Sequence, residues 1–168
     1  MSLKLERQDI INIATGSYKD RDHLDIDVIR EQKTAIYKNA QGILEMIYDL
    51  TLLEGALICD DFHKTKKTFS DLGEEYGYIH SFTERIDKSN VFRFQYRRPT
   101  PSGKIVRKSI KINRTIGGYS PSAFNRAGHE LEKELCILIE KDYLALRKES
   151  KAIRSALRKL SQYFQEER

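Results

Sequence analysis

The chain has 168 residues, which is enough for one compact domain and argues against two full domains. Hydrophobic residues make up 39% and charged residues 33%, a balance that excludes a wholly disordered chain and predicts a folded one. Lys and Arg number 30 against 25 Asp and Glu, so the net charge is +5 and permits an anionic partner. We therefore expect a single domain over residues 1–168.

The cysteines and the apolar runs indicate the compartment. Cys59 and Cys136 stand in apolar surroundings, with no CxxC and no metal-ligand spacing, and are expected to be free buried thiols. The first residues, MSLKLERQD, lack the apolar core of a secretory signal. No apolar run approaches the roughly 18 residues of a membrane span. We expect a soluble, cytoplasmic protein with no membrane partner.

Residues 25–72 are predicted to be helical, after a polar lead-in over residues 1–24 that carries no clear pattern. Asp25 or Asp27 can cap the helix. Gly42 and Gly55 each weaken a helix interior by roughly 1 kcal/mol relative to Ala, so one helix and two helices both stay open. An amphipathic spacing of three, four and seven residues joins the apolar positions Ile29, Ile36, Ala40, Ile43, Ile47 and Leu50.

Residues 76–114 predict a three-stranded antiparallel β-meander. Alternation of period two starts at Tyr78, and a turn follows at Asp87–Asn90. Phe92, Phe94 and Tyr96 then share one face, which we expect to be core. A loop with two prolines leads into a third alternating stretch that ends at Ile112.

A long helix over residues 120–165 completes the predicted fold. Ser120 can cap it and Pro121 suits its first turn. The fold class is therefore α+β, with N-terminal helices packed on the meander and a long C-terminal helix after it. The apolar stripe of this last helix is Phe124, Ala127, Leu131, Leu135, Leu138, Ala145, Leu146, Ile153, Leu157, Leu160 and Phe164.

Positive charge is concentrated in the meander. Residues 85–114 hold ten basic residues and one acidic residue, a charge of +9 that leaves −4 for the remainder. A second basic row, Arg147, Lys151, Arg154 and Arg158, follows one face of the last helix. Both rows could be solvated surface, but their shape and charge favour duplex DNA as the partner. The candidate nucleic-acid-binding residues are Arg93, Arg97, Arg98, Lys104, Arg107, Lys108, Lys111, Arg114, Arg154 and Arg158.

Motifs of catalysis are missing from the sequence. It holds no P-loop, GxSxG, HExxH or dinucleotide fingerprint, so we expect no enzyme activity, no cofactor and no metal. Two alternatives stay open. The first is a helical interaction or oligomerisation module, with a homodimer formed through the C-terminal helix. The second is a metal-dependent nuclease that would use Asp60, Asp61 and His63.

The order of these segments resembles the MobI-type accessory proteins of conjugative elements. The resemblance covers roughly residues 70 to 160, and rests on the basic three-strand segment, on Gly118-Tyr119-Ser120, and on the spacing of Glu140, Tyr143, Leu146 and Arg147. It implies a non-catalytic factor for the initiation of DNA transfer, acting at the transfer origin together with a relaxase.

Overall fold

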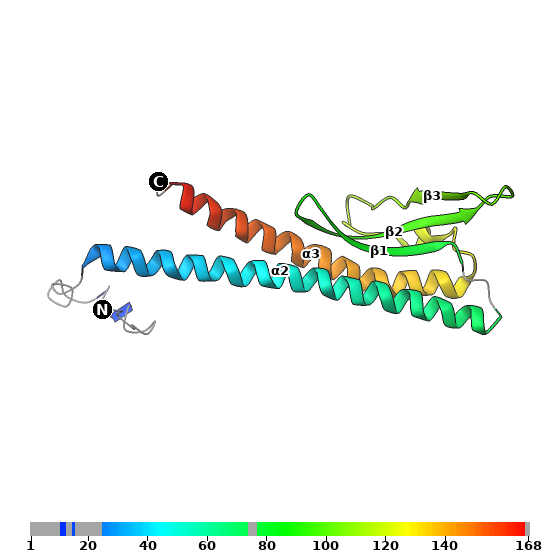
Figure 1. Cartoon of the computed structure of the whole chain (residues 1–168), viewed down its shortest axis with the longest axis horizontal. Coiled ribbons are helices and arrows are strands. Elements are labelled where there is room, and N and C mark those ends of the chain that lie inside the picture. The colour runs from blue at the N-terminus through cyan, green and yellow to red at the C-terminus, as the bar shows by residue number, and fades with distance from the viewer. Residues whose placement is uncertain (1–10, 13–14, 16–24, 74–76, 167–168) are drawn as a thin grey trace. The chain divides into compact units, whose positions relative to one another are not determined.

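The computed structural model describes residues 11–12, 15, 25–73 and 77–166, so most of the predicted lead-in 1–24 lies outside the described residues. The chain forms two compact units, residues 1–42 and 43–168. None of the helices within the described ranges combines the length and apolar character needed to cross a membrane. The predicted α+β class is confirmed. The elements are α2 (Ile26–Asp71), β1 (Ile79–Ile86), β2 (Ser89–Pro99), β3 (Ile105–Ser109), the 3-10 helix η2 (Pro121–Phe124) and α3 (Glu130–Glu166) (Figure 1).

Helix α2 is one continuous helix of 46 residues, which settles the question of one helix or two. Its start agrees with the sequence, because the Asp25 carboxylate accepts the backbone N–H of Asp27 at 2.8 Å. The helix runs through both Gly42 and Gly55. At Gly55 the missing side chain is required, since a Cβ there would overlap the ring of Phe92 on β2.

The buried face of α2 is not the face that the apolar spacing indicates. Ile36 and Leu50 of the predicted stripe are 67% and 55% exposed. The helix instead turns a mixed set of side chains toward the sheet and α3. Its buried residues are Tyr48, Thr51, Gly55, Phe62 and Lys66.

The three strands form the predicted antiparallel meander in the order β1-β2-β3. A two-residue turn joins β1 to β2, with positive φ at Asp87 (47°) and Lys88 (61°). Strand β3 ends at Ser109 instead of reaching Ile112 as the sequence predicts. In the register of the sheet, Ile112 would have donated to the Phe92 carbonyl, but the Arg147 guanidinium donates to it instead, at 2.7 Å.

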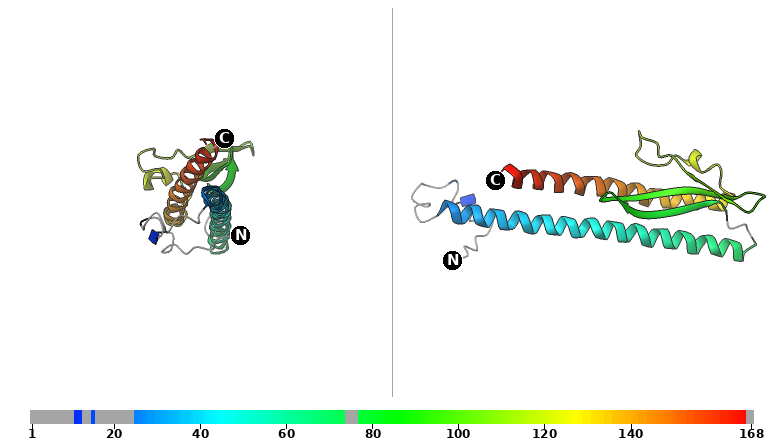
Figure 2. Two further views of the ribbon diagram at one scale, coloured as in Figure 1. Left: turned by 90° about the vertical axis from the view of Figure 1, so that its left-hand side faces the viewer. Right: turned by 45° about the horizontal axis from the view of Figure 1, so that its top comes forward.

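In the second unit the sheet lies along helix α3 (Figure 2). Aromatic side chains make up much of the core cluster that includes residues of the sheet and the helices. Phe92 and Phe94 are buried as predicted, whereas Tyr96 is half-buried. The ring of Phe94 packs edge-on against Phe62 at 6.0 Å and lies 5.5 Å from the ring of Tyr143. Burial raises the pKa of Tyr143 to about 12, and its hydroxyl contacts the Ser81 hydroxyl on β1.

Helix α3 begins at Glu130, so the predicted start at Ser120 is wrong. Pro121 opens only the short helix η2, which ends when Phe124 inserts into the core with its ring 5.0 Å from that of Phe94. The chain then turns before α3, and the ring Nδ1 of His129 accepts the backbone N–H of Glu132 at 3.2 Å. Tertiary packing of one aromatic ring therefore overrides the local capping signal.

The buried face of α3 carries polar groups that an apolar stripe does not reveal. Leu131 and Leu138, both in the predicted stripe, are 42% and 57% exposed. Leu146 and Ile153 of the stripe are buried as predicted, but the buried face also includes residues one position beyond Leu131, Leu135 and Leu138. Its buried residues are Glu132, Cys136, Ile139, Glu140, Tyr143, Leu146, Ser150 and Ile153.

The deepest polar contact is an ion pair between Lys66 and Glu132, whose side chains are both fully buried. Lys66 Nζ lies 2.5 Å from a Glu132 carboxylate oxygen, which also accepts the N–H of Ile79 at 2.8 Å. The other carboxylate oxygen accepts the N–H groups of Tyr78 and Gly128. Burial lowers the pKa of Lys66, and the hydrogen bond to Glu132 opposes that shift. One carboxylate thus ties α2, β1 and the start of α3 together.

Side chains of α2 cover the free edge of β1. Lys66 Nζ donates to the Ile79 carbonyl at 2.5 Å, and the Cys59 thiol donates to the Ser81 carbonyl at 3.3 Å. The Nε2 atom of His63 also lies 3.2 Å from the Ser81 carbonyl oxygen. An uncovered strand edge can pair with other chains, so this helix protects β1 from edge-to-edge association.

Gly55→Ala tests the close contact of α2 with the sheet. The added methyl group overlaps the buried Phe92 ring, and we expect the free energy of unfolding to fall by about 1–3 kcal/mol. Gly42→Ala is the matched control, since no atom lies within 4 Å of a Cβ there and Ala favours a helix interior. Chemical denaturation followed by circular dichroism measures both, and equal stability of the two variants would contradict the packing.

Glu132→Gln tests the buried ion pair. The variant leaves the Lys66 charge buried without a carboxylate, and the free energy of unfolding should fall by about 3–5 kcal/mol. The double variant Lys66→Met/Glu132→Gln should recover part of that loss because the unpaired charge is gone. As a control, Asp61→Asn breaks the exposed pair with Lys64 and should have little effect. A Glu132→Gln protein as stable as the wild type in urea would contradict the role of the pair.

Candidate nucleic-acid interface

The basic residues of the meander are divided between the two faces of the sheet. Arg97 stands opposite Arg107 in the register of β2 and β3, on the face turned away from the core. Arg93 lies four residues before Arg97 on β2 and therefore has its side chain on the same face. Arg98 and Lys108 lie on the other face, the one that also carries the aromatic side chains, at its outer end.

Six of the eight predicted residues in the meander are exposed and have no acidic partner among the described residues. They differ from Arg93, which is paired with Glu84 across the strands. They also differ from Arg97, whose guanidinium lies 4.6 Å from the ring centroid of Phe82 and donates to Gln95. The six are Arg98, Lys104, Arg107, Lys108, Lys111 and Arg114, which we call the β2–β3 basic surface.

The charge of this surface is uncompensated in the sequence around it. No Asp or Glu occurs between Lys88 and His129. Arg97 and Arg107 are also directly opposed, and like charges at such positions destabilise a sheet by up to about 1 kcal/mol. An anion bound beside them would remove that repulsion, because it would neutralise both guanidinium groups.

Two rings on the outer face were not singled out from the sequence. Phe82 lies beneath Arg97, and His80 stacks near Phe82 with ring centroids 6.5 Å apart. Burial lowers the pKa of His80 to about 4, with the charges of Lys66 and Arg97 acting in the same direction. His80 is therefore neutral near pH 7 and adds aromatic surface without adding charge. The alternation of residues in β1 could have identified both rings, since it places His80 and Phe82 on one face of the sheet and Ile79 and Ser81 on the other.

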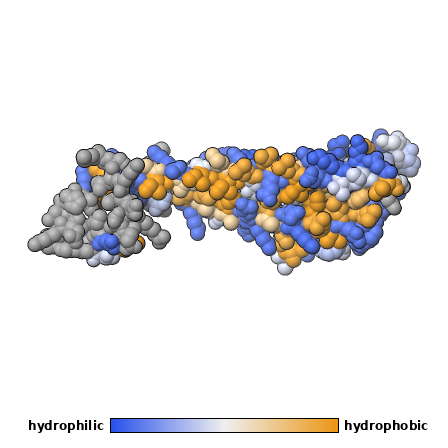
Figure 3. All heavy atoms as spheres, turned by 90° about the horizontal axis from the view of Figure 1, so that it is seen from below, coloured by the Kyte–Doolittle hydropathy of each residue, from blue (hydrophilic) through white to orange (hydrophobic). Residues whose placement is uncertain are grey.

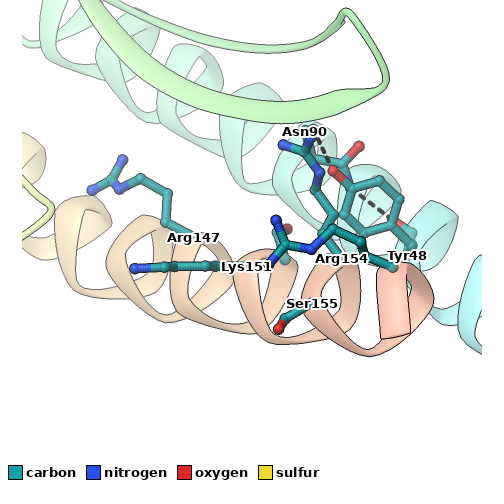
Figure 4. A pocket seen from close by; sticks show the side chains of 8 residues that line it. Tyr48, Asn90, Arg147, Lys151, Arg154 and Ser155 are labelled. Carbon is teal, nitrogen blue, oxygen red and sulfur yellow. Dashed lines mark hydrogen bonds between the residues drawn. The ribbon is translucent and has the colours of Figure 1, made fainter. Parts of the chain in front are cut away.

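Arg154 and Arg158 line a groove between α3 and the β1–β2 turn (Figure 4). The groove has a volume of about 580 Å³. Arg154 reaches across it, and its Nη1 donates to the Ser89 hydroxyl at 2.6 Å. The groove is lined by Tyr48, Asn90, Arg147, Ser150, Lys151, Arg154, Ser155 and Arg158.

The structure separates the ten candidate residues into two places. The groove lies at the β1–β2 turn, where β2 begins with Ser89. Lys104 lies at the other end of β2, in the loop after Pro99. A strand of this length spans about 33 Å at roughly 3.3 Å per residue, so the groove lies far from Lys104 and the loop that carries it.

Arg147 begins the predicted basic row but has a structural role. It pairs with Glu140, about two turns earlier on α3, and its Nε donates to the Gly117 carbonyl at 3.1 Å. Glu140 in turn accepts the N–H of Tyr119 at 2.8 Å. The charge of Arg147 is therefore neutralised, and Lys151, Arg154 and Arg158 supply the positive charge of the groove.

Asp60, Asp61 and His63, the residues of the nuclease alternative, do not form a common site. Asp60 and Asp61 are exposed, and Asp61 pairs with Lys64 at 3.4 Å. An Nε2 of His63 faces the Ser81 carbonyl on β1. Within the described ranges, no three or more His, Cys, Asp and Glu side chains are grouped as metal ligands.

Comparison with known proteins identifies no relative of this chain. No family model matches the sequence, and no curated protein and no solved structure matches the chain.

Proposed function

We propose that the protein binds duplex DNA without catalysing a reaction, as an accessory subunit of a nucleoprotein complex. The observation that supports this best is the β2–β3 basic surface, with six exposed cations and no acidic partner among the described residues. Lys and Arg of this kind bind DNA phosphates and release condensed counterions. On the strength of the segment order that resembles MobI-type proteins, we propose that this complex is cytoplasmic and acts at the transfer origin of a mobile genetic element, with a relaxase as partner.

The shape of the hairpin suits a contact with the DNA backbone. All five residues of β3 are exposed, and the loop that follows β2 carries Lys104. A two-stranded ribbon can enter the major groove or follow the phosphates along it. Arg107 and Lys111 are exposed and outside the core, so they can approach a duplex without a change in the core.

Charge reversal at Arg107 and Lys111 tests this surface. Arg107→Glu/Lys111→Glu should weaken binding to a duplex at least about tenfold at low salt, and should lower the slope of log affinity against log salt by about 2. Both side chains are exposed and outside the core, so the fold should be unaffected. Fluorescence anisotropy of a labelled duplex measures the affinity, and circular dichroism checks the fold.

Lys148→Glu/Lys159→Glu provides the matched control, because it makes the same change in net charge at exposed positions of α3. It should retain most of the affinity. An unchanged affinity of the Arg107→Glu/Lys111→Glu variant, or an equal loss in both variants, would contradict the proposed surface.

A second candidate function is self-association through α2. Within the second unit, Ile43, Leu50 and Leu57 follow one another at intervals of seven, and are 52%, 55% and 58% exposed. Met46 and Leu53 are also exposed and fill the intermediate positions of the heptads. Figure 3 shows apolar side chains gathered on this side of the molecule. A seven-residue repeat suits packing against an identical repeat, so the partner we propose is the α2 helix of a second copy.

Leu50→Glu/Leu57→Glu tests self-association. The variant places charges in the proposed seam and should convert a dimer into a monomer in size-exclusion chromatography with light scattering. Leu138→Glu is the control, because Leu138 is 57% exposed on α3 and lies outside the repeat. A wild-type protein that stays monomeric at high concentration would contradict this candidate and leave DNA binding in place.

A further inference from the structure

The groove between α3 and the β1–β2 turn contains a buried hydroxyl group with no partner. Ser150 is only 5% exposed, and its Oγ forms no hydrogen bond. A hydroxyl removed from water without a partner destabilises a fold by about 1–3 kcal/mol. Ser150 lines the groove, so a ligand with a hydrogen-bond acceptor in the groove would satisfy this group.

The charges around Ser150 determine the kind of acceptor. Lys151, Arg154 and Arg158 line the same groove, and none forms an ion pair with a described residue. No Asp or Glu lines the groove. Arg154 is held in place by its hydrogen bond to Ser89, so one guanidinium is already positioned. Three cations beside a hydroxyl donor form a site for an anion with several acceptor oxygens.

The groove offers room and an aromatic wall in addition to charge. Its volume of about 580 Å³ exceeds what a bare phosphate needs and falls in the range of sites for small ligands. The Tyr48 ring lines one side, and the hydroxyl of Tyr48 is fixed because it accepts the N–H of Asn90 at 2.9 Å (Figure 4). Tyr48 is only 7% exposed, so its ring bounds the groove, and recognition of a ligand rests on the groups that can bind a phosphate.

We infer that this groove binds the phosphate group of a nucleotide, with Ser150, Lys151, Arg154 and Arg158 as its ligands. The phosphate comes either from a free mononucleotide or from a nucleic-acid strand, and the chemistry of recognition is the same for both. The site lies at the β1–β2 turn, and the inference does not depend on DNA binding by the β2–β3 basic surface.

Isothermal titration calorimetry with thymidine 5′-monophosphate, thymidine and inorganic phosphate tests the inference. The wild-type protein should bind the monophosphate and should not bind thymidine. Arg154→Ala/Arg158→Ala should weaken binding at least about tenfold, as the loss of two charged hydrogen-bond donors predicts. The control Lys148→Ala/Lys159→Ala removes the same charge from α3 outside the groove and should bind like the wild type.

Ser150→Ala separates a binding role from a structural one. The variant removes a buried hydroxyl that has no partner, so the protein should be at least as stable as the wild type. Its affinity for the monophosphate should nevertheless fall by about threefold to tenfold. A Ser150→Ala protein with unchanged affinity, or a wild-type protein that binds neither monophosphate nor phosphate, would overturn the inference.

Duplex binding by the groove variants identifies the source of the phosphate. If Arg154→Ala/Arg158→Ala weakens both monophosphate and DNA binding, the groove holds a phosphate of a nucleic-acid strand. If only monophosphate binding is weakened, the groove holds a free nucleotide. The Arg107→Glu/Lys111→Glu variant should keep monophosphate binding in either case, so failure of the DNA proposal is distinguishable from failure of this one.

Discussion

The buried ion pair of Lys66 with Glu132 is the contact on which the arrangement of α2, β1 and α3 depends. Glu132 accepts one ammonium group and three backbone N–H groups, which come from Tyr78, Ile79 and Gly128. The chain approaches the carboxylate so closely at Gly77 that a Cβ there would overlap it. A charged group can stay buried only with such partners, and each of these partners fixes a different segment.

The same arrangement occurs again further along α3 and explains the shape of the sheet. Glu140 accepts the N–H of Tyr119 and pairs with Arg147, and Arg147 donates to the Phe92 carbonyl. Because an arginine satisfies that carbonyl, β2 does not need a longer third strand at this end. Strand β3 therefore stays short, and its basic residues face solvent. Two polar anchors on one helix thus leave the β2–β3 basic surface open.

The sequence predicts much of this fold where local patterns are decisive. Alternation locates the strands and identifies Phe92 and Phe94 as core residues, and the Asp25 cap marks the start of α2. The patterns fail where tertiary contacts decide. No local pattern identifies the pair of Lys66 and Glu132, because the two residues lie 66 positions apart in the chain, yet both are buried and satisfy each other.

The apolar residues Ile36, Leu50 and Leu138 belong to the predicted core stripes, yet they are exposed. The buried faces of the two helices instead carry the ion pairs Lys66–Glu132 and Glu140–Arg147. The candidate site shows the same limit. The density of basic residues locates the meander surface, but no local pattern reveals that Arg154 reaches Ser89 on β2 or that Ser150 lacks a partner.

Exposed cations on the hairpin and in the groove have one common consequence, which is attraction for phosphate. The most direct measurement is a titration of the wild-type protein into a labelled duplex by fluorescence anisotropy, at about 50 and 200 mM salt, with heparin as competitor. Binding that falls steeply with salt and still prefers the duplex to heparin is the predicted result. No binding at the lower salt concentration would contradict a role in DNA recognition.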